Sequence, residues 1–523
     1  MKRLKSKSFR MDQPMKKLKS RAASPGRPQV LPVYMGGHGT VRAREILQES
    51  VEDVLREVLP AHDALSVCKM HRHVAAATVD SYVQPKSVIR EVRSYLNTSK
   101  LDGKPLVVTG AQGCGKTALL AHIIAREVET SDFKVVAPFF LRGTPGGTDL
   151  GHLVDSLSQE ICSGLPTPTE RSLKLLRKFP IFDRLLQAFI LCATFPDVNV
   201  LVVVDGLEDI SIDMAMLAPE EQAEQRQMEE TGNAVVLPLM QLAWLPMQLP
   251  PNVKMVVSMV DASASQLTLE WIEALEEFEC KLVTISHLNK SLYKDVVDSM
   301  LRRNDTLDLQ ERQQYMVVFE DLWEHKHLRS PFALNLFILE IVGPGEEDDY
   351  IAELVLAAGN RSLLRRVLQR LLYVFDWLPA SMPANTLQLL WAAGPQGIAP
   401  DELLDVARQL CEAPQLHQLH WQTLYHAMNR LGLVRRAGGM VWLSSRMMQD
   451  AVASEFFTGK PPAQRQAHRA LFRTLEMFYI EKVTARTKID MVDASKRIRN
   501  TVADHEFLRH KRLMKYYRAK GKS

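Results

Sequence analysis

The chain has 523 residues, of which 46% are hydrophobic and 24% are charged, and its net charge is +4. This length supports several domains with proper cores, and no apolar run approaches the ~20 residues of a membrane-spanning helix, so we expect no membrane span. The six scattered cysteines form no Cys-x-x-Cys pair, which argues against a zinc site or a disulfide framework and favours a reducing compartment.

Positive charge is concentrated at the two ends of the chain. Residues 1–28 contain ten Lys and Arg against one acid, and residues 509–523 contain seven and no acid, so the body between them is net acidic. The two ends contain few apolar residues that could form a core. Residues 1–30 and 509–523 are therefore predicted to be basic tails, and the first is predicted to be disordered. They are candidates for binding a polyanion such as RNA or an anionic surface, or for nuclear or cytoskeletal association of a cytoplasmic protein, and simple solvation is the alternative.

Helical spacing of apolar residues follows the N-terminal tail. Apolar residues recur every three or four positions over 46–58, and a second helical stretch covers 63–77, so residues 31–85 are predicted to form a helical linker. His71 and His73 lie in the second stretch. Because residues two apart face different sides of a helix, ordinary packing or exposure is predicted for them rather than metal binding.

A phosphate-binding loop is predicted between a strand and a helix. The apolar run 106–108 leads into Gly110-x-x-x-x-Gly115-Lys116-Thr117, and helix-forming residues follow. Glycines allow successive backbone N–H groups to turn toward a polyphosphate, Lys116 is expected to reach the β- and γ-phosphates, and the Thr117 hydroxyl is expected to ligate Mg²⁺. The predicted cofactors are ATP or ADP with Mg²⁺, and Lys116 is also a catalytic candidate. The nucleotide-binding candidates in this loop are Gly110, Gly113, Cys114, Gly115, Lys116, Thr117 and Ala118.

Four further apolar runs predict strands of the same sheet, at 133–141, 200–205, 249–258 and 281–286. Pro138 cannot donate to a ladder, so the first of these runs is predicted at an edge. The run 200–205 is continuous and β-branched, which is typical of a parallel strand buried on both faces. Five strands alternating with helical segments predict an α/β parallel five-stranded P-loop NTPase sheet over residues 86–288.

Acidic residues follow the strand 200–205. Asp205 stands where ligands gather in open parallel sheets, and we predict that it holds Mg²⁺ together with Thr117. Glu208 and Asp209 are catalytic candidates for orienting the attacking water, with helix capping as the alternative role for either one. Ser258, at the predicted end of the fourth strand, is a candidate phosphate-sensing residue.

The chain beyond residue 288 is predicted to be mainly helical. Residues 289–378 are expected to form a helical lid, and residues 379–458 a winged helix made of helices and two short strands across Gly438-Gly439. The segment 420–430 carries few cations, which favours packing over DNA binding. No repeat is present in 461–509, so 459–508 is predicted to be a helical extension.

The order of these motifs resembles that of NACHT-type STAND nucleotide switches, most closely the nephrocystin and telomerase-associated-protein branch. The resemblance covers about residues 62–457. Besides the motifs above, it draws on Pro250-Pro251-x-Val253, on Ser330-Pro331-Phe-Ala-Leu334, and on the runs 71–96, 139–157 and 443–452.

The resemblance implies an ATP-driven switch in which the diphosphate keeps the core, lid and winged helix closed, and the triphosphate opens them for self-association or for binding a protein partner. It also implies nucleotide contacts from Pro331 and from the winged helix. The chain departs from the family at Gln84-Pro85, at Met259, and at Ser445, where many relatives carry a phosphate-contacting His; the adjacent Arg446 is the candidate substitute.

Three functions are therefore open at this stage. The first is an ATP-binding switch with slow hydrolysis, which would make the chain a slow P-loop ATPase. The second is an interaction scaffold that keeps its nucleotide with little or no turnover and is tethered through its basic tails. The third is a remodelling or replication-initiator ATPase, which predicts turnover stimulated by nucleic acid.

Overall fold

The structure is a computed structural model. It describes residues 67–79, 83, 85–98, 103–127, 132–144, 147–210, 242–303, 307–342, 348–378, 382–410, 418–437 and 439–457. The predicted helix at 46–58, both basic tails and the whole of the predicted extension 459–508 lie outside these residues. None of the helices in the described ranges has the length and apolar character that a membrane span requires.

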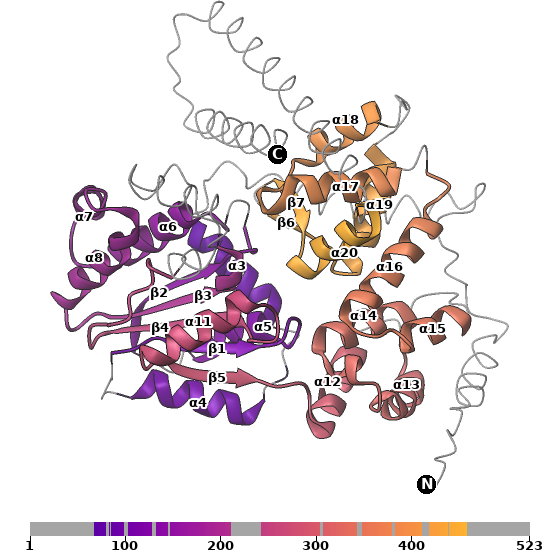
Figure 1. The fold of residues 1–523 in the computed structure, drawn as a ribbon, viewed down its shortest axis with the longest axis horizontal. Helices are drawn as coiled ribbons and strands as arrows, with labels where there is room; N and C mark the ends of the chain where they lie inside the picture. The colour runs from indigo at the N-terminus through magenta and orange to yellow at the C-terminus, as the bar shows by residue number, and fades with distance from the viewer. Residues whose placement is uncertain are drawn as a thin grey trace, which may run out of the picture. The chain divides into compact units, whose positions relative to one another are not determined.

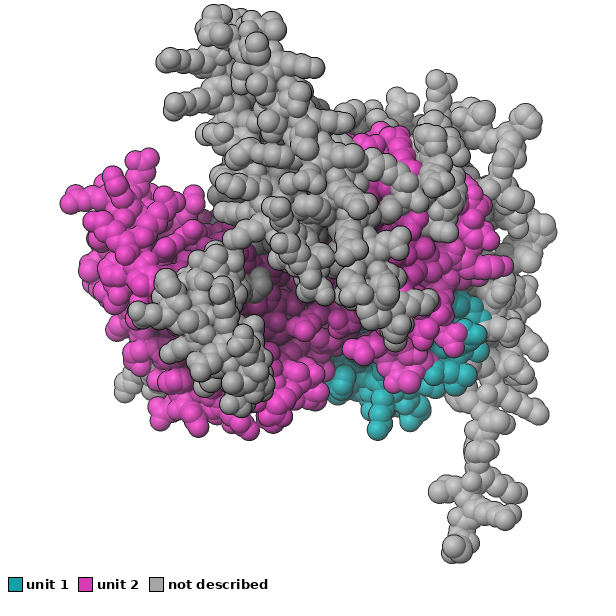
Figure 2. Space-filling model, turned by 45° about the horizontal axis from the view of Figure 1, so that its top comes forward, with its two compact units in different colours: residues 1–63, 287–356 teal, residues 64–286, 357–523 magenta. Residues whose placement is uncertain are grey.

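The described residues fall into two compact units, coloured separately in Figure 2. Unit 1 contains residues 287–356, and unit 2 contains residues 67–286 together with residues 357–457. The predicted lid, 289–378, therefore spans the division between the units.

Five parallel strands form the sheet of unit 2, in the order β2-β3-β4-β1-β5 (Figure 1). This confirms the predicted parallel five-stranded α/β sheet. Pro138 lies in β2, which is an edge strand as predicted. The strand bounds are β1 Leu106–Gly110, β2 Phe133–Phe140, β3 Asn199–Asp205, β4 Val253–Val260 and β5 Lys281–Ile285.

The fourth strand differs from its predicted bounds of 249–258. Pro250 and Pro251 have no backbone N–H to donate, so β4 begins at Val253. It then continues past Ser258 to Val260, because β1 pairs with it as far as Gly110. Ser258 is therefore an interior residue of the strand rather than its last residue.

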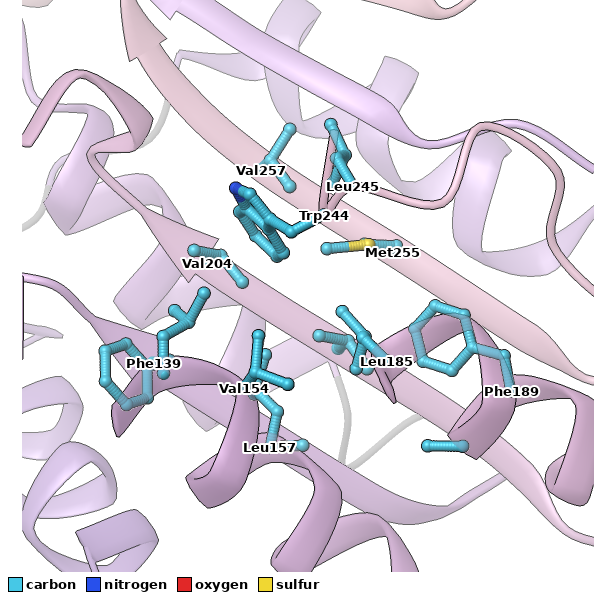
Figure 3. Packing of buried hydrophobic residues seen from close by; sticks show 14 of the residues in the cluster. Phe139, Val154, Leu157, Leu185, Phe189, Val204, Trp244, Leu245, Met255 and Val257 are labelled. Atoms are coloured by element: carbon cyan, nitrogen blue, oxygen red, sulfur yellow. The ribbon is translucent and has the colours of Figure 1, made fainter. Parts of the chain in front are cut away.

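Helices cover both faces of the sheet, because alternate residues of each strand point to opposite sides. Val202 and Val204 of β3 join one hydrophobic cluster, and Leu201 and Val203 join the other. The first cluster, part of which is shown in Figure 3, includes Trp244 together with residues of α6 Leu150–Ser163, α7 Thr169–Leu176, α8 Ile181–Ala193 and α11 Gln266–Glu277. The second includes residues of α3 Val67–Val79, α4 Lys86–Asn97 and α5 Lys116–His122.

His71 on α3 is a buried packing residue. Its Nδ1 accepts a hydrogen bond of 3.1 Å from the backbone N–H of Phe140, and burial, with a smaller contribution from His152, lowers its pKa to about 3. His73 is exposed, and no cluster of metal-binding side chains occurs in the described ranges. The imidazole of His71 therefore anchors α3 to β2 in its neutral form.

Unit 1 is helical in its described residues. Asn289 and Asp308 each cap a helix by accepting a hydrogen bond from a backbone N–H of the first turn, and Pro331 occupies the first position of α14, where its missing N–H is tolerated. The elements are α12 Lys290–Arg302, α13 Leu309–Leu322, the short η6 Lys326–Arg329, α14 Pro331–Ile341 and α15 Asp348–Val355.

The second part of unit 2 begins with α16 Asn360–Val374. It continues with a group of elements that we call the hairpin module: α17 Met382–Ala393, η8 Gly394–Gln396, α18 Pro400–Leu410, α19 Gln418–Arg430, β6 Val434–Ala437, β7 Met440–Leu443 and α20 Arg446–Phe456. Strands β6 and β7 pair antiparallel across the predicted Gly-Gly turn. The helices and the hairpin predicted for this region are thus present.

Candidate functional site

The P-loop connects the end of β1 to the start of α5. Its tight path needs glycine: Gly115 has a φ of 104°, in the left-handed region, and a Cβ on Gly110 would lie 2.7 Å from both the Cys114 Sγ and the Ile285 carbonyl oxygen. Lys116 Nζ donates hydrogen bonds to the carbonyl oxygens of Gly110 at 2.7 Å and Ala111 at 3.1 Å. The ammonium group is therefore held over the loop that would surround a phosphate.

Thr117 and Asp205 meet across the carboxyl end of the sheet. The Thr117 hydroxyl donates to Asp205 Oδ2 at 2.7 Å, and the Ser258 hydroxyl donates to Asp205 Oδ1 at 2.6 Å. Burial raises the pKa of Asp205, although these two hydrogen bonds and Lys116 oppose the shift. A buried carboxylate stabilised mainly by hydroxyl groups is a suitable site for a cation.

This arrangement fits Mg²⁺. The metal prefers oxygen ligands and commonly uses one or two protein groups, with phosphate and water oxygens completing its octahedron. Thr117 Oγ1 and the Asp205 carboxylate are the two protein oxygens that the structure brings together. Ser258 donates to Asp205 and accepts a hydrogen bond from the Gly206 N–H at 3.0 Å, and its role as a phosphate sensor stays a prediction.

Glu208 and Asp209 have different surroundings, although they are adjacent in η4 Leu207–Asp209. Burial, and secondarily the charge of Asp209, raises the pKa of Glu208 to about 7, and its Oε2 accepts from the Val260 N–H at 3.3 Å. Both Asp209 oxygens are bonded to Arg142, whose Nε and Nη2 donate at 2.6 and 2.7 Å. Glu208 is therefore the better candidate for orienting water, and Asp209 serves as a buried ion-pair partner.

The hairpin module and α16 contact this site within unit 2. Arg446 Nη1 donates to the backbone carbonyl of Glu208 at 3.2 Å. The Trp442 indole donates to the Arg142 carbonyl at 3.0 Å, and Asn360 Nδ2 donates to the Gln112 carbonyl in the P-loop at 3.3 Å. Residues far from the P-loop in the sequence therefore lie against both the phosphate loop and the acidic segment after β3.

The remaining predicted residues lie as follows. Gly113 and Cys114 are in the loop, Cys114 is buried, and Ala118 lies in the first turn of α5. Pro331 begins α14 in unit 1, and its nucleotide contact stays a prediction. Arg446 reaches the backbone of Glu208, while its contact with a phosphate stays a prediction.

Sequence reasoning missed Arg142, Asn360 and Trp442. Arg142 could have been found, because it comes two residues after β2, at the carboxyl edge of the sheet where ligands gather. No spacing or motif marks Asn360 or Trp442, since their contacts depend on how the hairpin module packs.

Residues 89–228 match the family model described as nephrocystin 3, N-terminal. The match begins within α4 and includes the P-loop, β2, β3 and η4, and it confirms the nephrocystin-like resemblance for this part of the chain. No curated protein matches the chain.

Solved structures of P-loop ATPases are similar at low identity. A Walker-type ATPase of Pyrococcus abyssi has 12% identity and a TM-score of 0.33, covering 71% of this chain and 96% of its own. The Aeropyrum pernix ORC2 protein, in ADPNP and ADP complexes, has 15% identity and a TM-score of 0.32, covering 72% of this chain and 96% of its own. Because these scores are low, the fold class rests on the strand order and the P-loop described above.

Proposed function

We propose that this nephrocystin-like P-loop protein is an ATP-binding molecular switch of the NACHT and STAND type, with slow hydrolysis. The observation that carries the proposal is the hydrogen bond of 2.7 Å between Thr117 and Asp205, in a site where α16 contacts the P-loop and the hairpin module contacts the segment after β3. A phosphate-and-metal site in contact with a distal module is what a nucleotide-controlled conformational change requires.

The protein groups have separate roles in this proposal. The P-loop amides and Lys116 hold the phosphates, and Thr117 and Asp205 hold Mg²⁺. Bound Mg²⁺ would neutralise charge on the β- and γ-phosphate oxygens. Glu208, whose pKa lies at about 7, holds and orients the attacking water. Both carboxylate oxygens of Asp209 accept hydrogen bonds from Arg142, so Asp209 is not assigned this role.

The hairpin module is the proposed winged helix, and it acts as the moving part. Its hydrogen bonds to Glu208 and Arg142 are made to backbone carbonyls, so their release separates no ion pair. Exchange between diphosphate and triphosphate would shift the balance between contact and release, and thereby control self-association or binding of a protein partner.

Turnover by the purified full chain tests the proposal. We expect slow ATP hydrolysis by the wild type, loss of nucleotide binding in Lys116→Ala, and retained binding without hydrolysis in Glu208→Gln. Equal background rates in all three proteins, with nucleotide still bound by the wild type, would favour the scaffold. Strong stimulation by DNA would favour a replication-initiator type of ATPase.

The basic tails carry a separate proposal, because they extend from an acidic body and lie outside the described residues. Binding of a polyanion through them should weaken steeply with salt. Deletion of residues 1–28 and 509–523 should abolish retention on RNA or anionic vesicles, and unchanged retention would exclude this role.

A further inference from the structure

Arg435 lies on the face of the hairpin that is turned toward the nucleotide site. It is the second residue of β6, and it pairs with Trp442 of β7. Residues directly opposite in an antiparallel ladder project from the same face. Since Trp442 is only 1% exposed and donates to the carbonyl of Arg142, just beyond β2, this face packs against the carboxyl end of the sheet.

The Arg435 guanidinium is enclosed by protein but has no direct partner. In the described part of the chain it makes no hydrogen bond and no ion pair at contact distance. Burial lowers its pKa, the Asp205 charge opposes that shift, and the Arg142 charge adds to it. The residue as a whole is half-buried, as expected for one that lines a site rather than the core. An arginine stays charged, so this environment favours an anion beside it.

We infer that Arg435 is a phosphate-binding residue through which the hairpin module recognises the terminal phosphate of a nucleoside triphosphate. This inference rests on the proposed function, because the nucleotide must occupy the P-loop. In P-loop enzymes the residues that hold the metal lie beside the β- and γ-phosphates, and Thr117 and Asp205 are the residues that would hold it here. The γ-phosphate therefore lies on the Asp205 side of the site, where Arg435 is found.

A triphosphate and a diphosphate should affect Arg435 differently. The γ-phosphate offers oxygens that match the planar fork of a guanidinium, so it supplies charge-assisted hydrogen bonds that Arg435 lacks within the described residues. A diphosphate ends before this position and leaves only the longer-range attraction of Asp205. Because Trp442 and Arg446 link the same module to the site, contact of Arg435 with a γ-phosphate would hold the module against the site in the triphosphate state, which is the reverse of the order that the family resemblance implies.

Equilibrium titration of the full chain with fluorescent ADP and with a non-hydrolysable ATP analogue, each with Mg²⁺, tests this inference. We expect Arg435→Gln to weaken binding of the ATP analogue by about tenfold or more, since a charge-assisted contact is lost, while ADP binding changes by less than about twofold. Arg435→Lys keeps the charge without the fork, so its loss should be intermediate.

Arg436→Gln is the matched control. Arg436 is the next residue of β6 and therefore projects from the opposite face, where its guanidinium lies 6.0 Å from the Tyr425 ring centroid. This variant should bind both nucleotides as the wild type does. If thermal melting shows that Arg435→Gln is unfolded, Arg435→Lys decides the question.

The outcomes separate this inference from the function on which it rests. A wild-type chain that binds neither nucleotide overturns both. A second outcome is that the wild type binds both nucleotides, and the Arg435 variants change the affinities for the ATP analogue and for ADP equally or not at all. This result overturns only the role of Arg435. A selective loss of the ATP analogue, absent from Arg436→Gln, supports it.

Discussion

The two sides of the candidate nucleotide site are built in different ways. The P-loop side comes from consecutive residues between β1 and α5, and Lys116 bonds to its own loop. The other side combines the segment after β3 with Arg142 and with residues of the hairpin module. Trp442 and Arg142, for example, are 300 positions apart. The first side needs only its local sequence, whereas the second exists only while the module is packed, which suits it to change with the bound nucleotide.

Removing Arg142 should disrupt the second side most strongly. Arg142→Ala leaves Asp209, whose side chain is 10% exposed, without its partner, and breaking a buried ion pair in this way costs about 3–5 kcal/mol of unfolding free energy. Urea unfolding measures this loss. Arg365→Ala is the control, because Arg365 is 54% exposed in its pair with Glu455 and should cost less than about 1 kcal/mol. Equal losses in the two variants would contradict the difference between buried and exposed pairs.

The pH dependence of stability should distinguish Glu208 from an exposed carboxylate. Its folded-state pKa of about 7 lies above its usual value, so the folded chain binds more protons than the unfolded chain in that window. Stability therefore falls as pH rises from about 4.5 to about 7, by on the order of 2–3 kcal/mol.

Glu208→Gln should remove this part of the slope, and Asp205, whose pKa is also raised, should keep a slope of the same sign. Unfolding free energies of both proteins at about pH 5 and about pH 8 provide the measurement. A slope that the substitution does not change would show that Glu208 is ionised throughout the range.

A side chain on Gly110 should strain the P-loop side. The new Cβ of Gly110→Ala would lie 2.7 Å from the Ile285 carbonyl oxygen, and overpacking of this kind costs about 1–3 kcal/mol. Gly359→Ala is the matched control, because no atom lies within 4 Å of its added Cβ, and it should stay within about 1 kcal/mol of the wild type. Thermal unfolding compares the two, and a nucleotide titration should show weaker binding only for Gly110→Ala.

Trp442→Phe should produce the smallest effect on stability. It keeps most of the packing but leaves the carbonyl of Arg142 without its indole donor, a loss of about 1 kcal/mol. Trp377→Phe, at a residue that is 50% exposed, should stay within about 0.5 kcal/mol of the wild type. Identical denaturation midpoints for the two variants would mean that the indole hydrogen bond does not hold the hairpin to the sheet.

Much of the fold was predictable because its signals are local. Continuous β-branched runs indicated the buried parallel strands, and Pro138 placed β2 at the edge. The bounds of β4 were wrong, because the pairing with β1, and not the apolar pattern, determines where that strand ends. Ser258 consequently lies inside the strand, where its hydroxyl donates to Asp205.

The candidate site was predictable only in part, because some of its contacts follow from local sequence and others depend on packing between distant segments. Asp205 could be paired with Thr117 because strand ends of a parallel sheet meet at one edge. The difference between Glu208 and Asp209 could not be predicted, since it depends on Arg142, which lies just beyond the neighbouring strand β2.

The sequence by itself determined the phosphate loop, its lysine and its two candidate metal ligands, since backbone geometry and strand polarity follow from neighbouring residues. Only the tertiary structure decided which of the two adjacent acids is held by Arg142, and which arginine of the hairpin is subject to the charge of Asp205. These features depend on burial and on charges that folding brings together from distant parts of the chain, so no local sequence pattern predicts them.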